Sequence, residues 1–171
     1  MRIPTLYEEY QIDFKLTFSK KFSTSGEHTV IRLTNTDSDA NDPGDGVPVF
    51  QIRKMKKVYL KTRNNLNEYS AEKNHKLVKN VKKSFQIKQE IANGGFNLLL
   101  TEDGTTVFNE VFVDDYPNEH TNIRVYVTDT FSTAARAVME DLVITTCRHM
   151  IFSQLSIIYS FLRFEHVFPL L

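Results

Sequence analysis

Acidic and amide side chains gather in one short segment of the chain. The segment holds Asp37, Asp39, Asn41, Asp42 and Asp45. Calcium takes about six to eight oxygen ligands, and a turn rich in Asp and Asn can wrap such ligands around the ion. These residues therefore predict a calcium site, although not an EF-hand, because Asp42 replaces the glycine of that loop. The alternative is a plain turn, since Asp, Asn, Pro and Gly are ordinary turn residues.

Basic residues are concentrated in a different stretch. From Arg53 to Lys83 there are eleven Lys or Arg and two acids, whereas Glu102 to Glu119 holds six acids and no basic residue. If Val58 and Leu60 face the core of a strand, their alternate neighbours line the opposite face. The predicted ligand-binding ribbon comprises Lys57, Tyr59, Lys61 and Arg63, helped by Lys79, Lys82 and Lys83.

A cationic ribbon with one aromatic ring suits an anionic glycan. Sulfate and carboxylate groups along a polysaccharide can meet several lysines at once, and Tyr59 can cover a sugar face. The alternative is a solvated sheet face, on which lysines keep edge strands from aggregating. The whole chain has 21 basic and 21 acidic residues, so we expect no nucleic-acid partner.

Residue patterns that carry catalysis are scarce. The sequence has no Gly-x-Ser-x-Gly elbow, no Walker loop, no His-Glu-x-x-His and no Cys-x-x-Cys. Glu140 and Asp141 would point to opposite faces of a strand, so the paired carboxylates of a glycosidase are not indicated. The lone Cys147 is either a buried, inert thiol or a half-cystine to another chain. We therefore expect a protein that is not an enzyme.

Length and composition indicate one globular domain. The chain has 171 residues, of which 41% are hydrophobic and 25% charged. A chain of this size buries about two-thirds of its unfolded surface, which is enough for a core without a disulfide. We expect one domain that needs no covalent staple.

Apolar residues recur with a period of two. Tyr10, Ile12, Phe14, Leu16 and Phe18 alternate with polar residues, which predicts a strand with one buried face. Further strands are predicted at residues 29–34, 47–52 and 56–63.

Two tight hairpins are predicted in succession. Asn93-Gly94 and Asp103-Gly104 supply the residues that a type I′ turn requires. They connect strands at 85–91, 96–100 and 107–113, and another strand is predicted at 123–127. Such short turns impose antiparallel pairing.

Residues 134–142 are ambiguous between helix and strand. Alanine, methionine and glutamate favour a helix. Strands at regular intervals of roughly ten residues favour a sandwich, which a strand from Ala137 to Ile144 would complete. We predict the strand. The expected core includes Phe14, Leu16, Phe85, Ile87, Leu98, Val125 and Val127.

Several stretches together resemble a known superfamily. They are Glu9 to Leu16, Thr29 to Thr34, Gly44 to Phe50 and Asn122 to Phe131, followed by Ala134-Ala135 and Asp141-Leu142. The chain resembles divergent modules of the laminin G-like, concanavalin A-like lectin/glucanase superfamily. This resemblance implies an all-β, antiparallel jelly-roll β-sandwich. It also implies calcium at the rim. The galectin signature is missing, since the chain has no tryptophan.

The last residues depart from this pattern. Residues 1–146 form the predicted sandwich, and residues 147–171 form an apolar tail, either helical or not native to the domain. Arg163 and Glu165 interrupt the tail before it reaches the roughly 20 residues of a membrane span. No leader precedes Glu8, so we expect a cytoplasmic protein or a fragment of a secreted one.

Two classes of function remain open. The first is a non-catalytic, lectin-like adhesion module that binds a glycan or an extracellular protein. The second is a structural or protein-interaction sandwich without carbohydrate binding, because a widespread fold does not determine a function.

Overall fold

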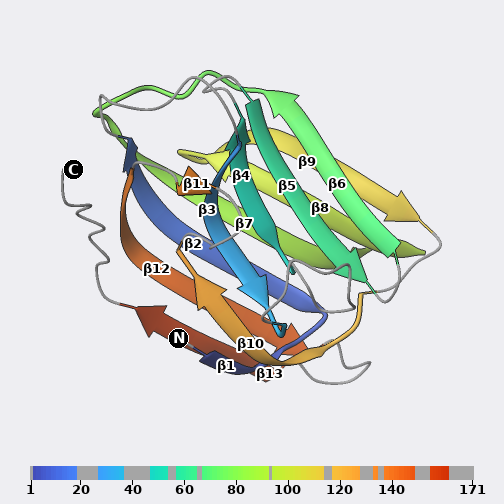
Figure 1. Cartoon of the computed structure of the whole chain (residues 1–171). Helices are drawn as coiled ribbons and strands as arrows, with labels where there is room; N and C mark the ends of the chain where they lie inside the picture. Colours follow the sequence, from blue (N-terminus) through green and yellow to red (C-terminus); the bar gives the residue numbers. More distant parts are fainter. Residues whose placement is uncertain are drawn as a thin grey trace.

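The computed structural model is built from β-strands in two layers (Figure 1). It describes residues 2–18, 27–36, 47–53, 57–64, 67–92, 94–113, 117–127, 133–134, 137–148 and 155–161. All regular secondary structure in these ranges is β-strand. Accordingly, none of the described segments is a helix of the length and apolarity that crossing a membrane requires.

The first sheet, sheet A, has the order β1-β10-β3-β4-β5-β6, and β11 pairs with β3. Its strands are β1 (Arg2–Leu6), β3 (Glu27–Thr34), β4 (Val49–Arg53), β5 (Lys57–Asn64), β6 (Asn67–Asn74), β10 (His120–Tyr126) and β11 (Thr133–Ala134). All pairs along the main path are antiparallel.

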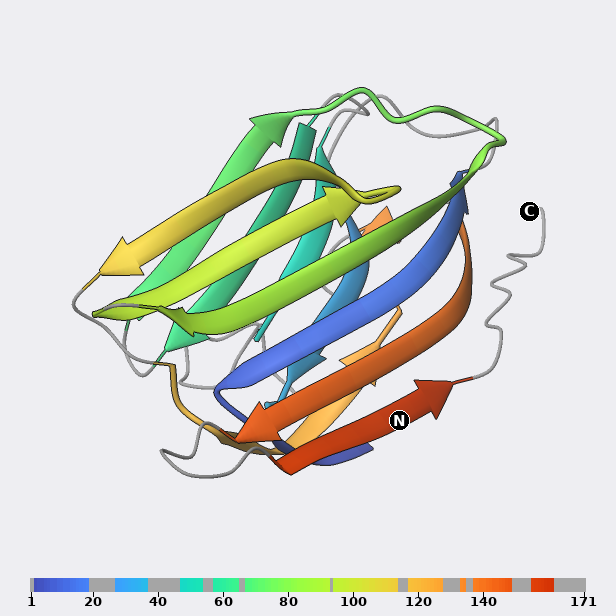
Figure 2. The same cartoon turned by 180° about the vertical axis from the view of Figure 1, so that it is seen from behind.

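The second sheet, sheet B, has the order β13-β12-β2-β7-β8-β9, and Figure 2 shows it in front. Its strands are β2 (Glu9–Phe18), β7 (Lys82–Ala92), β8 (Gly95–Glu102), β9 (Thr105–Val113), β12 (Ala137–Arg148) and β13 (Leu155–Phe161). Its pairs are antiparallel too, so the predicted all-β antiparallel sandwich is confirmed.

The core lies between the two sheets and follows the predicted alternation. Phe14 and Phe85 stack with ring centroids 5.7 Å apart, and Phe50 of sheet A packs against both. The predicted core residues Leu16, Ile87, Leu98 and Val125 are buried as well, whereas Val127 is only partly buried against the core.

The turns explain the meander of sheet B. Asp103 and Gly104 have φ values of 49° and 77°, the positive values that a type I′ turn requires. Gly94 has a φ of 79°, and Asn93 lies outside the described residues. The predicted strand at Ala137 is confirmed and runs to Arg148.

Two expectations need correction. For the apolar tail, the helical alternative is wrong over Leu155–Phe161, because these residues form β13 and pair with β12. Backbone pairing to an existing sheet edge satisfies the same groups that a helix would satisfy internally. The domain boundary at residue 146 remains a prediction.

The second correction concerns Glu140 and Asp141. The register between β12 and β2 shifts between Glu140 and Val143, which marks a β-bulge, and Asp141 has a φ of 53°. Met139 and Leu142 are both buried, so the bulge adds one residue to the solvent face. Glu140 and Asp141 therefore lie on the same face and not on opposite ones.

Candidate functional site

The predicted ribbon lies on the outer face of sheet A. Val58 and Leu60 are fully buried, and the alternate residues Lys57, Tyr59 and Lys61 point away from the core. Arg63 lies on the same face but is only 5% exposed. With Arg53 of β4, these residues form what we call the basic face: Arg53, Lys57, Tyr59, Lys61 and Arg63, together with Glu68 and Glu72 of β6.

Strand β6 supplies acidic partners for the cations of β5. Antiparallel pairing sets Tyr59 opposite Glu72 and Arg63 opposite Glu68. Glu72 accepts from Arg53 at 3.0 Å and also pairs with Lys57. Glu68 accepts from Arg63 at 2.5 Å and from Lys61 at 3.1 Å. Four cations thus face two carboxylates, which leaves an excess of two positive charges.

These contacts change the acidity of both glutamates. Hydrogen bonds from Lys57 and Arg53 lower the pKa of Glu72. Partial burial works to raise the pKa of Glu68, but the hydrogen bonds from Arg63 and Lys61 outweigh it and lower the pKa. The guanidinium of Arg53 lies 3.7 Å from the ring centroid of Tyr59. A ligand on the basic face would therefore compete with Glu68 and Glu72 for the cations and with Arg53 for the ring of Tyr59.

The three helper lysines do not join this face. Lys82 and Lys83 belong to β7 of sheet B, and the exposed Lys79 precedes them in the connection from β6. Lys82 pairs with Glu140 at 2.5 Å. The four ribbon residues therefore lie together on β5, whereas the three helper lysines lie on β7 or just before it, so the structure does not bring the two groups together. Ligand binding by these residues stays a prediction.

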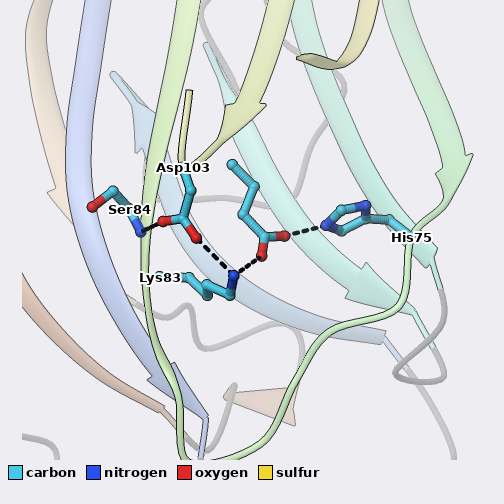
Figure 3. A network of polar contacts seen from close by, with 5 residues as sticks. His75, Lys83, Ser84 and Asp103 are labelled. Atoms are coloured by element: carbon cyan, nitrogen blue, oxygen red, sulfur yellow. Dashed lines mark hydrogen bonds and ion pairs between the residues drawn. The ribbon is translucent and has the colours of Figure 1, made fainter. Parts of the chain in front are cut away.

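Lys83 belongs to a polar network that links β7, the β8–β9 turn and the segment directly after β6 (Figure 3). Its ammonium donates to Asp103 at 2.6 Å and lies 3.3 Å from Glu102, which also contacts His75. The Ser84 amide donates to Asp103 at 2.9 Å. These bonds raise the pKa of Lys83 and lower that of Asp103. The network fixes the β8–β9 turn against β7.

The outer face of sheet B carries a hollow of about 430 Å³, which we call the groove. Its polar lining comes from four strands and one turn: Asp13, Lys15, Ser84, Gln86, Thr101, Gly104 and Asp141. Phe14 and Phe85, buried between these residues along β2 and β7, complete it. Register explains the grouping, since Asp13 pairs with Gln86, Lys15 with Ser84, and Gln86 with Thr101.

Side chains in the groove hold one another in place. Gln86 donates to one oxygen of Asp13 at 2.9 Å, and Gln11 donates to the other at 2.7 Å. Lys15 donates to Asp141 at 2.7 Å, and this bond lowers the pKa of Asp141 and raises that of Lys15. The groove is therefore a preorganised array of donors and acceptors on rigid strands.

Sequence reasoning missed the groove. The polar alternation along β2 indicated that Asp13 and Lys15 face solvent, but it gave no register with Ser84, Gln86 and Thr101. Asp141 reaches the groove only through the bulge, which no sequence signal marked.

The predicted calcium ligands lie at 37–46, outside the described residues, so the site stays a prediction. Within the described ranges, no group of three or more His, Cys, Asp or Glu is arranged to hold a metal ion. Cys147 is half-buried in β12, rather than fully buried.

Comparison with known proteins defines the fold. No protein-family model and no curated protein sequence matches the chain. A heptameric SAP-like pentraxin from Limulus polyphemus has a TM-score of 0.55 at 6% identity, over 84% of this chain and 66% of its own. Likeness at this identity shows the fold alone, a jelly-roll sandwich of the concanavalin-like kind.

Two carbohydrate-binding modules are also similar in structure, at TM-scores below 0.5. The Ruminococcus gnavus IT-sialidase CBM40, bound to α2,3-sialyllactose, has a TM-score of 0.48 at 11% identity, over 71% of this chain and 77% of its own. The module CBM66 from Bacillus subtilis has a TM-score of 0.44 at 13% identity, over 83% of this chain and 75% of its own.

Proposed function

We propose that this chain is a non-catalytic, lectin-like module that binds a glycan in the groove. The observation that carries the proposal is the arrangement of hydroxyl, amide and charged groups around a hollow of about 430 Å³. Sugar hydroxyls both donate and accept hydrogen bonds, so they fit a surface on which Ser84, Gln86 and Asp13 offer both roles. Hydrogen bonds from Gln11 and Gln86 orient Asp13 before a ligand arrives, which lowers the entropy cost of binding.

The acidic groups of the groove suit binding better than proton transfer. A glycosidase of the common kind needs one carboxylic acid with a raised pKa beside a second carboxylate. Lys15 lowers the pKa of Asp141, and two amides hold Asp13. This arrangement supports a binding role.

A broad glycan array tests the proposal with wild-type protein and the double variant Gln86→Ala with Thr101→Ala. We expect defined oligosaccharides to bind and the double variant to lose about tenfold or more in affinity, since each lost hydrogen bond contributes on the order of 1 kcal/mol. Asn109→Ala is the matched control, because Asn109 lies exposed on the same sheet outside the groove. An array without binding, or an equal loss in the control, would contradict the proposal.

A second candidate is an anionic polysaccharide on the basic face, favoured by its excess of two positive charges. The isolated protein should stay on heparin beyond about 0.3 M salt, because such contacts are electrostatic. Lys57→Ser with Lys61→Ser should end this retention, whereas Lys73→Ser with Lys76→Ser removes the same charge elsewhere and should preserve most of it. Elution with a neutral control protein would leave the basic face as a solvated sheet face.

The setting of the module is also a proposal. The sequence resemblance to laminin G-like modules supports an extracellular, adhesive role, with a glycan or an extracellular protein as partner. A structural sandwich without carbohydrate binding is the competing function, and the same array separates the two.

A further inference from the structure

The lysines around the groove pair with neighbouring carboxylates. Among the described residues, three lysines lie on this outer face, and each has a carboxylate within ion-pair distance. Lys15 pairs with Asp141 at 2.7 Å, Lys82 with Glu140 at 2.5 Å, and Lys88 with Glu90 at 2.5 Å. These six residues therefore contribute no net charge to the surface around the groove.

Asp13 is the groove carboxylate outside these pairs. Its two oxygens accept from the amides of Gln11 and Gln86, at 2.7 Å and 2.9 Å, and no cation within the described ranges forms an ion pair with it. Amide donors orient a carboxylate without cancelling its charge. Each carboxylate oxygen has two lone-pair sites, so Asp13 keeps acceptor capacity toward the groove.

Lys15 is a candidate to neutralise Asp13, since both side chains project from the same face of β2. Asp141 instead holds the Lys15 ammonium, and their contact raises the pKa of Lys15 and lowers that of Asp141. The bulge in β12 thus has a consequence for binding, because it brings in the acid that leaves Asp13 without a cation.

We infer that the groove selects a glycan that contains a free amino sugar, with the sugar ammonium on Asp13 and its hydroxyls near Ser84 and Thr101. The inference rests on the proposed function and adds the class of glycan. An ammonium on a carboxylate forms a charge-assisted hydrogen bond, about twice as strong as a neutral one. The negative charge of Asp13 would repel sulfated or carboxylated sugars and so weaken their binding.

Calorimetry with two matched probes tests this selectivity at a mildly acidic pH that keeps the sugar amine charged. The probes are fully deacetylated chitosan tetrasaccharide and fully acetylated chitin tetrasaccharide, which differ only in the charge and acetylation of the amine. We expect the chitosan probe to bind about tenfold more tightly to wild-type protein. Asp13→Asn should bring the two affinities within about twofold, since it keeps the shape and removes the charge.

Glu110→Gln is the matched control, because it removes one negative charge from an exposed position on β9 outside the groove. It should preserve the wild-type ratio. In wild-type protein, added salt should weaken binding of the chitosan probe and leave the chitin probe nearly unchanged, which tests the inference even if Asp13→Asn does not fold. Equal binding of both probes, or a ratio that Asp13→Asn leaves intact, would overturn the amino-sugar inference while glycan binding stands. Absence of binding by every sugar tested overturns both.

Discussion

The two outer faces of the sandwich use charge in opposite ways. On the basic face, four cations of β4 and β5 form ion pairs with two carboxylates of β6. Around the groove, each of three described lysines pairs with a carboxylate, whereas Asp13 forms no ion pair with a described residue. The run of eleven basic residues therefore overstates the charge of the surface it forms, because register brings Glu68 and Glu72 beside it.

The difference also concerns how well each face is prepared for a ligand. On the basic face, Arg53 covers Tyr59, and the glutamates engage the cations that a ligand would need. In the groove, the internal hydrogen bonds orient Asp13 and leave part of its acceptor capacity open. A ligand in the groove can therefore add hydrogen bonds to those already present, whereas a ligand on the basic face must replace existing ion pairs.

The largest effect is expected from a substitution in the core, which supports both faces. Phe85 is 2% exposed and packs against Phe14 and Phe50, so it links the sheet behind the groove to the sheet behind the basic face. Phe85→Ala should lower the free energy of unfolding by about 3 to 5 kcal/mol in urea titrations, because a large buried ring leaves a cavity. The exposed Thr106→Ala should change it by less than about 0.5 kcal/mol. A loss below about 1 kcal/mol for Phe85→Ala would show that the inner face is assigned wrongly.

A smaller effect is expected when the two carboxylates of the basic face are neutralised. Glu68→Gln with Glu72→Gln frees the cations of the basic face, so the double variant should elute from heparin later by roughly 0.1 M salt, since these groups lie well within one Debye length. Glu110→Gln with Glu119→Gln makes the same change in net charge on other strands or loops and should shift elution less. Equal shifts in the two variants would mean that net charge, and not the basic face, governs retention.

The smallest effect is a pH dependence of stability. The pKa values of Glu68 and Glu72 are lowered in the folded state, so their stabilisation is fully present above their unfolded pKa of about 4.5. It is lost as the pH falls through the lower folded values. The free energy of unfolding should therefore decline below about pH 4.5, and Glu68→Gln with Glu72→Gln should make that decline shallower. An unchanged slope in the double variant would show that these ion pairs add no stability.

The sequence predicted the strands with strong alternation and missed the two edge strands of sheet A, β1 and β6. Residues 10–18 and 85–100 alternate clearly, and they became β2, β7 and β8. Strand β6 was missed because it is an edge strand with one buried residue, Ala71, among polar neighbours. Strand β1 was missed as well, since it is short and contains Pro4. Apolar character in the tail did not separate strand from helix, because only pairing with β12 decides between them.

The candidate site was less predictable than the fold, for a physical reason. Facing follows from alternation within a strand, so the outward direction of Lys57 and Lys61 could be predicted. Which residues become neighbours across a sheet depends on the register between the strands, and the sequence does not give that register. Examples are the pairs Lys15 with Glu140 and Gln86 with Thr101. The bulge at Asp141 changes facing itself, and a sequence of helix-favouring residues gives no sign of it.

Mapping of amide chemical shifts by NMR during titration tests the central claim most directly. The titrant is the oligosaccharide that binds most tightly on the glycan array. Binding in the groove predicts that the largest shifts fall on Ser84, Gln86, Thr101 and Gly104, with Tyr59 and Lys61 unchanged. Shifts concentrated on β5 and β6, or no shifts at saturating sugar, would contradict the account.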